Sequence, residues 1–415
     1  MSCIAVSVVI PTYNHGRWIT SAIQSVLAQT YSDFEVIVVD DGSSDDTRAV
    51  VEAWGDRIRY IWQENQGLSA ARNTGIVAAS GRYIGVLDAD DMYEPEFMAT
   101  LVPRLAEVES ADAIYCGYRF VDHLNAPLPQ REARVTAPER FYTALLDGNF
   151  LVPESMLVRR ACYEAVGLFD ISLRACEDWD MWLRIAATHN VICTDEVLTR
   201  HRILPGSMST DPMRMLTSRL AVLNKHVGAE PVDANVGSAT QRRAYGRAYL
   251  GSTIEYLQAG NLNRAHRSFR RMVQICPELL SELDTFYQLA LGDQPKGSLG
   301  DFQTLDFDQN FTILSKLLDD VFEQPAINPM CSQYQEEAHA NMYLAFGMLS
   351  YGARLFPAAR SYLKNALLAN PRLALRWQVS ALWAKSFLDP RWIDRAGETY
   401  RRIANTRSRG HGLSG

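Results

Sequence analysis

The chain of 415 residues contains no run of about 18 consecutive apolar residues, the length that a membrane-spanning helix needs. It also lacks the pattern of a signal peptide, because the apolar run at residues 6–10 ends at Pro11 and no basic segment precedes it. Glycine and proline are few, at 25 and 17 residues, which excludes a collagen-like or low-complexity protein. We therefore expect a globular, cytoplasmic protein.

Cysteine and positive charge are also scarce. The seven cysteines form no Cys-x-x-Cys pair, so neither a disulfide framework nor a structural zinc site is indicated. Acidic residues outnumber basic ones by 48 to 41, and the net charge of -7 argues against nucleic acid as a partner. The glycine-rich phosphate loops of dinucleotide-dependent enzymes and of nucleoside triphosphatases are missing, which argues against both classes.

The character of the chain changes near residue 225. Before that point, short β-rich runs alternate with segments of helical period. The expected strands are 6–10, 36–39, 58–62 and 83–87, and the expected helices are 19–27, 47–54 and 68–79. This alternation predicts an α/β domain over residues 1–225, with a doubly wound, mostly parallel sheet. Ligands of such sheets bind at the carboxyl ends of the strands, so polar residues there are site candidates.

Residues 226–415 predict an all-α helical domain instead. Two segments share a spacing of small residue, bulky residue and proline that loosely resembles a tetratricopeptide-type helical repeat of about 34 residues. The matched positions are Tyr256, Ala265, Phe269 and Pro277 in one segment and Ser350, Ala359, Leu363 and Pro371 in the other. A plain helical bundle is the alternative, because residues 284–335 separate the two segments.

Carboxylates follow two of the expected strands. Asp40 and Asp41 come after strand 36–39, and adjacent carboxylates repel each other unless a donor N–H or a cation shares their charge. After strand 83–87, Asp88 and Asp90 are two residues apart and can converge on one point in an extended segment. Such oxygen ligands suit Mg²⁺ or Mn²⁺ that also binds substrate phosphates. The simpler explanations are an Asp-Gly turn and a solvated acidic turn.

A third acidic group stands where a helix is expected to begin. Glu177 and Asp178 would occupy the first helical turn, which the helix dipole favours, while Trp179 and Trp182 would face the core. The functional alternative is that the helix presents Asp178, or its neighbour Glu177, beside two aromatic rings that line a sugar. We favour the functional interpretation.

Five segments occur in the order and approximate spacing of the family 2 glycosyltransferases. They are VSVVIPTYN at 6–14, DDGS at 40–43, GLSAARN at 67–73, DADD at 88–91 and ED at 177–178. Over residues 1–225 the chain thus resembles this family of inverting enzymes, which have the GT-A fold and use nucleotide-diphosphate sugars. The resemblance does not cover residues 226–415.

The resemblance implies a role for each matching residue. Those implied to contact the donor are Pro11, Thr12 and Tyr13 at the nucleobase, Asp41 at its ring N–H, Asp88 near the ribose, and Arg72. Asp90, together with Asp91, would bind the Mn²⁺ or Mg²⁺ that bridges the two phosphates. Asp178 would be the general base, with Glu177 as the alternative.

One segment departs from the family pattern. The family often carries Tyr-Arg-x-His-x-Gly-Ser late in the domain, with a histidine that approaches the metal or the diphosphate. Here HRILPGS at 201–207 places Leu204 at that position. His201, three residues earlier, either substitutes for the missing ligand or is an ordinary, partly buried histidine.

The sequence therefore predicts an inverting, metal-dependent glycosyltransferase of hexosyl type. One carboxylate takes the proton of an acceptor hydroxyl that attacks the sugar C1, and the cation stabilises the leaving diphosphate. The expected partners are a nucleotide-diphosphate sugar and a glycan, lipid-linked or protein acceptor, in bacterial surface or secondary polysaccharide biosynthesis. The alternative is a catalytically silent nucleotide-binding or scaffold protein.

The helical half is expected to bind a partner, the carrier of the acceptor, or a second copy of the chain as a homo-oligomer. Its terminus is basic, through Arg391, Arg395, Arg401, Arg402, Arg407 and Arg409. These residues would allow peripheral contact with anionic lipid at the inner face of the membrane, or form a solvated tail.

Overall fold

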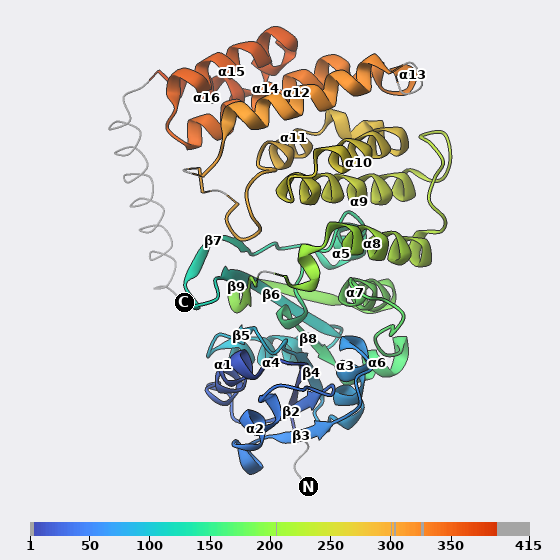
Figure 1. Ribbon diagram of the computed structural model, residues 1–415, viewed down its shortest axis with the longest axis vertical. Coiled ribbons are helices and arrows are strands. Elements are labelled where there is room, and N and C mark those ends of the chain that lie inside the picture. Colours follow the sequence, from blue (N-terminus) through green and yellow to red (C-terminus); the bar gives the residue numbers. More distant parts are fainter. Residues whose placement is uncertain (1–3, 205, 300, 303, 325–327, 388–415) are drawn as a thin grey trace, which may run out of the picture.

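The computed structural model describes residues 4–204, 206–299, 301–302, 304–324 and 328–387. A helical half is stacked on an α/β half (Figure 1). The basic residues between 391 and 409 lie outside the described residues, so the expected lipid contact is untested. None of the described helices is both long and apolar enough to cross a membrane.

The strands of the first half form a single sheet. They are β1 (Val6–Thr12), β2 (Phe34–Asp40), β3 (Arg59–Trp62), β4 (Tyr83–Val86), β5 (Met92–Tyr93), β6 (Ala113–Val121), β7 (Pro127–Glu132), β8 (Met156–Arg159) and β9 (Val191–Arg202). Their order is β3-β2-β1-β4-β8-β6-β9-β5, and β7 pairs with β6. The run β3-β2-β1-β4 is parallel, as is β6 with β9, and the remaining pairs are antiparallel. The predicted α/β fold with a mixed, mostly parallel sheet followed by a helical region is confirmed.

Helices cover both faces of this sheet. They are α1 (Gly16–Leu27), α2 (Thr47–Glu52), α3 (Leu68–Ala78), α4 (Phe97–Glu107), α5 (Pro138–Leu146), α6 (Arg160–Val166) and α7 (Glu177–Thr188), and the next helix in the chain is α8 (Pro212–Val227). In α1 the buried residues Ile19, Ala22, Ile23 and Val26 recur at the three- and four-residue spacing of an amphipathic helix. The predicted helix 47–54 is shorter in the structure, because a 3₁₀ turn starts at Gly55.

Helix pairs build the second half. Its helices are α9 (Ala239–Gln258), α10 (Leu262–Ile275), α11 (Leu283–Ala290), α12 (Phe307–Glu323), α13 (Asn328–Cys331), α14 (Gln335–Gly352), α15 (Phe356–Ala369) and α16 (Trp377–Lys385). The pairs α9/α10 and α14/α15 are each followed by a 3₁₀ helix that starts at a proline, Pro277 and Pro371. The predicted helical region is confirmed, and its assignment to tetratricopeptide-type repeats stays a prediction.

Helix α8 connects the halves. Val222 and Leu223 are buried in the same apolar cluster as Trp182 of α7 and Tyr245 of α9. The boundary predicted near residue 225 thus falls within α8, and the prediction of two separate domains, 1–225 and 226–415, stays a prediction.

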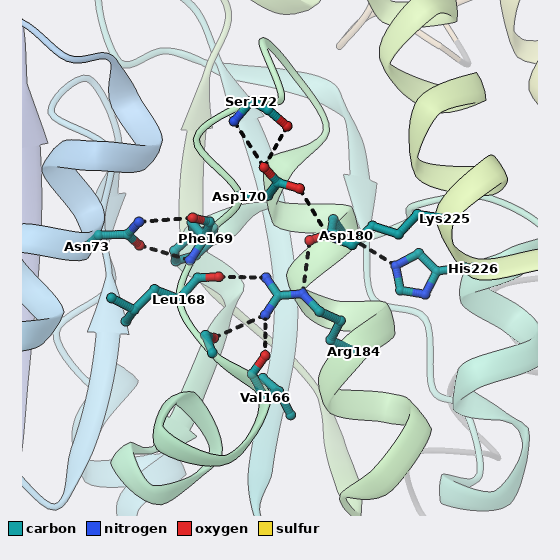
Figure 2. A network of polar contacts seen from close by, with 11 residues as sticks. Asn73, Val166, Leu168, Phe169, Asp170, Ser172, Asp180, Arg184, Lys225 and His226 are labelled. Atoms are coloured by element: carbon teal, nitrogen blue, oxygen red, sulfur yellow. Dashed lines mark hydrogen bonds and ion pairs between the residues drawn. The ribbon is translucent and has the colours of Figure 1, made fainter.

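A polar network fixes α8 to α7 (Figure 2). The buried carboxylate of Asp180 accepts hydrogen bonds from Arg184 Nε at 2.9 Å and His226 Nε2 at 3.0 Å, and Lys225 Nζ lies 2.9 Å away. Although desolvation raises the pKa of Asp180, these partners together hold it well below its usual value. Asp180 is therefore an ionised structural anchor.

Candidate active site

Several predicted site residues meet at the carboxyl edge of the parallel strands. Thr12 at the end of β1 pairs with Asp40 at the end of β2, and β4 lies on the other side of β1. Pro11 and Thr12 are buried, and the Thr12 hydroxyl has no hydrogen-bond partner among the described residues. Tyr13 is 46% exposed, so its ring is accessible for stacking.

Both carboxylates after β2 are bound by the protein itself. Asp40 accepts hydrogen bonds from the Ser43 N–H and the Tyr60 hydroxyl, both at 2.8 Å. Asp41 accepts three, at 2.7–3.0 Å, from donors in residues 63–67. Their mutual repulsion is thus relieved without a ligand, so the pair alone does not require one. The contact of Asp41 with a nucleobase stays a prediction.

Arg72 of α3 joins two of the acidic segments. Its buried guanidinium lies with Nη2 at 2.7 Å from Asp88 Oδ1 and Nη1 at 2.5 Å from Glu177 Oε1. It also lies over the Phe169 ring, 5.4 Å from the centroid. Because Glu177 is held in this buried ion pair, it is poorly suited to accept a proton, which leaves Asp178 as the better candidate.

Asp178 is oriented by Asn149. The Asn149 side-chain amide donates to Asp178 Oδ2 at 2.8 Å, and its carbonyl accepts from the Leu151 N–H at 3.1 Å, which turns the NH₂ group towards Asp178. Burial and the neighbouring charge of Glu177 raise the pKa of Asp178 to about 6, while Arg72 and the Asn149 hydrogen bond oppose this rise. Asp178 is therefore ionised at neutral pH yet basic enough to take a proton.

The tryptophans beside Asp178 belong to the core. Trp179 and Trp182 are buried, and the Trp179 indole N–H donates to the Leu145 carbonyl at 2.8 Å. The interpretation that these rings line a sugar is wrong, because the amphipathic α7 turns them inward.

Asp90 and Asp91 lie in different surroundings. The Asp90 carboxylate makes no hydrogen bond or ion pair with any residue that the structure describes, while its backbone carbonyl accepts from Arg202 Nε at 2.7 Å. Burial and the carboxylates of Asp91 and Asp88 raise the pKa of Asp90. A crowded carboxylate without a partner fits a hard divalent cation such as Mn²⁺ or Mg²⁺.

Asp91 points inward, to His201. The His201 Nδ1 lies 3.0 Å from Asp91 Oδ2 and 3.0 Å from Glu154 Oε1, and Asp91 Oδ1 accepts from the Arg202 N–H at 2.7 Å. Desolvation lowers the pKa of His201, but the two carboxylates raise it more, so an imidazolium balances them. These three side chains are close enough to hold a metal ion, which would have to displace that proton.

Two residues of this site were not anticipated from the sequence. Glu154 interrupts the apolar run around it, and an isolated acid in such a run is a signal for a buried charge. Asn149 gives no such signal, because an asparagine before a turn is ordinary and only the fold brings it to Asp178.

Known proteins resemble this chain in sequence and in structure. The model of the family "Glycosyl transferase family 2" matches residues 7–167. The "Uncharacterized glycosyltransferase RP339" of Rickettsia prowazekii is 34% identical over 220 residues, which cover 51% of this chain and 68% of that protein. The chondroitin synthase of Escherichia coli is 32% identical over 209 residues, which cover 46% of this chain and 29% of the synthase. Among solved structures, TarS of S. aureus is similar with a TM-score of 0.46 and 18% identity, covering 84% of this chain and 55% of TarS.

Proposed function

Because the chain belongs to glycosyltransferase family 2, we propose that it is an inverting, metal-dependent hexosyltransferase acting on an acceptor hydroxyl. Members of this family transfer a sugar from a nucleotide sugar. Our proposal adds that the sugar is a hexose, that its anomeric configuration inverts and that the reaction needs a metal ion. The observation that carries it is Asp178, a partly exposed carboxylate with a raised pKa, held by Asn149 at the carboxyl edge of the sheet.

Asp178 acts as the general base. Its ionised carboxylate accepts the proton of the acceptor hydroxyl while the hydroxyl oxygen bonds to the sugar C1 and the C1–diphosphate bond breaks. Attack from the face opposite the leaving group inverts the anomeric carbon. Arg72 keeps Glu177 and Asp88 in place beneath the reacting groups.

The donor lies across the carboxyl ends of β1, β2 and β4. Tyr13 stacks on the base, Asp41 accepts its ring N–H, and Asp88 lies near the ribose. Asp90 is the residue that would hold Mn²⁺ or Mg²⁺, and Asp91 supports it from the His201 side. When bound, the cation supplies Lewis-acid stabilisation to the departing diphosphate.

The acceptor is proposed to be a glycan, free or linked to a lipid or protein. The similarity to a protein named chondroitin synthase supports a glycan, because that name describes the synthesis of a polysaccharide.

A panel of nucleotide sugars tests the proposal. We expect release of a nucleoside diphosphate with Mn²⁺ or Mg²⁺ from at least one hexose donor, and its loss in Asp90→Ala. Asp56→Ala is the matched control, since this exposed carboxylate lies away from the site. If no donor yields nucleoside diphosphate while the folded chain still binds nucleotide, the chain is a silent nucleotide-binding protein and the proposal is wrong.

A further inference from the structure

A loop of the helical half reaches the sheet next to the active site. The connection between α11 and α12 descends to β7 (Figure 1). There the Gly297 N–H donates to the Gln130 side-chain carbonyl at 2.9 Å, and the Gln130 N–H donates to the Gly297 carbonyl at 3.0 Å. Two hydrogen bonds to one residue anchor the loop on β7.

Glycine at position 297 allows this close approach. Gly297 has a φ of +89°, and a Cβ there would lie 2.7 Å from Leu128 Cδ1 and 3.4 Å from atoms of Ile203 and Phe120. Ile203 belongs to the segment 201–207, in which Leu204 stands where the family pattern has a histidine. The loop therefore packs directly on the segment that has a leucine in place of the histidine of the family pattern.

Lys296 precedes this anchor and is exposed. Its Nζ lies 5.7 Å from the centroid of the Phe120 ring, and it makes no hydrogen bond or ion pair with the part of the chain that the structure describes. Phe120 also packs edge-to-face against the His201 ring, with the ring centroids 5.7 Å apart, and His201 contacts Asp91. The Lys296 ammonium and the His201 ring thus both pack against Phe120, and His201 in turn contacts the carboxylates of Asp91 and Glu154.

The charges that act on Lys296 come from both halves. Desolvation lowers the pKa of Lys296, Glu255 raises it and Arg219 lowers it, and Asp178 and Asp91 raise it further. Arg219 and Glu255 are already paired with each other, with one contact at 2.9 Å. Asp178 and Asp91, two residues of the candidate active site, thus act on the Lys296 ammonium through their charge, without an ion pair to it.

We propose that Lys296 binds the diphosphate of the donor, so that the helical half contributes a cation to the active site. The inference rests on the proposed function, which supplies an anionic substrate to this position. A lysine ammonium is a compact charge with three donors and suits a phosphate oxygen. As the leaving diphosphate gains charge, the contact strengthens in the transition state.

Calorimetric titration of the full-length chain with UDP and with GDP, at saturating Mn²⁺, tests this role. Lys296→Ala should weaken binding of the preferred nucleoside diphosphate about tenfold, the usual effect of losing one charge-assisted hydrogen bond at a partly exposed site. Lys296→Arg should restore most of the affinity. Lys316→Ala, which removes an exposed lysine of α12, should bind like the wild type.

A second variant separates the position of the charge from its presence. Gly297→Ala keeps Lys296 but displaces the loop, and it should weaken binding to a similar extent. Equal affinity of Lys296→Ala and wild type for the preferred nucleotide would overturn the inference and leave the proposed function intact. If the wild type binds none of the nucleoside diphosphates of the donor panel, the proposed function fails, and the role of Lys296 fails with it.

Discussion

Removing the hydrogen bond that orients the proposed base should move the pH profile of the enzyme. Asp178 has a raised pKa of about 6, and the Asn149 amide opposes that rise by stabilising the ionised form. Asn149→Ala therefore raises the pKa of Asp178 further. Since only the ionised carboxylate accepts a proton, activity is present above the pKa and is lost as the pH falls through it.

The magnitude follows from the contact. A hydrogen bond to a charged group at an exposed site contributes about 1 kcal/mol, and 1.36 kcal/mol corresponds to about one pKa unit. We expect the acid limb of kcat/KM near pH 6 for the wild type and about half to one unit higher for Asn149→Ala. Below the limb, the rate should fall about tenfold per pH unit, because the ionised fraction does.

The assay is the release of nucleoside diphosphate from the active donor between pH 4.5 and 8.5 (about two units on either side of the limb), with Mn²⁺ held at saturation. Asn235→Ala is the control, because it removes an exposed asparagine side chain from the connection between α8 and α9. A wild-type limb near pH 4, the ordinary range of an aspartate, would refute the assignment of Asp178. Superimposable wild-type and Asn149→Ala profiles would refute the positioning role of Asn149.

Three more predictions test the site and its frame. Asp178→Asn should lower sugar transfer by about 10² to 10⁴ with donor binding retained, whereas a large loss in Glu177→Gln alone would make Glu177 the base. Asp180→Asn should lower the free energy of unfolding at pH 7 by about 3 kcal/mol in urea titrations. The difference should shrink below about pH 4, because Asp180 of the unfolded chain becomes protonated there while the folded carboxylate stays ionised; equal stability at pH 7 would contradict an anchoring role. A chain ending at Gly237 should show the circular dichroism of an α/β unit and bind nucleoside diphosphate with Mn²⁺, only more weakly without the helical half; an insoluble product would show that the first half needs the apolar cluster it shares with α9 in order to fold.

The strands of the first half could be predicted because each is a short apolar run between polar turns. Every residue of β1 is buried, as a strand covered by helices on both faces requires. The second half could be assigned only to helices, because the packing that distinguishes a repeat from a bundle depends on contacts between distant segments. Pro277, for example, starts a 3₁₀ helix, and a proline there is compatible with a repeat as well as with a plain helical bundle.

The candidate site was predictable as a set of segments and not as a set of contacts. Asp91 was placed with Asp90 because the two are adjacent, yet its carboxylate turns to His201 and Glu154, which are far away in sequence. The same limit applies to Asp40, whose partner Tyr60 belongs to the neighbouring strand. Local spacing shows where carboxylates gather, whereas long-range packing decides what each one binds.

The charge balance of the site explains why two carboxylates differ from the rest. Arg72 compensates Asp88 and Glu177, His201 compensates Asp91 and Glu154, and backbone and side-chain amides hold Asp41. Among the described residues, the Asp90 carboxylate has no hydrogen-bonding or ionic partner, and the Asp178 carboxylate is held by neutral groups, the Asn149 amide and the Trp179 N–H. Burial and neighbouring carboxylates raise the pKa values of Asp90, Asp91 and Asp178, and among these three only Asp91 is paired with a cationic side chain, His201. Asp90 is therefore suited to bind a divalent cation, and Asp178 is suited to accept a proton. Inverting sugar transfer from a diphosphate requires both.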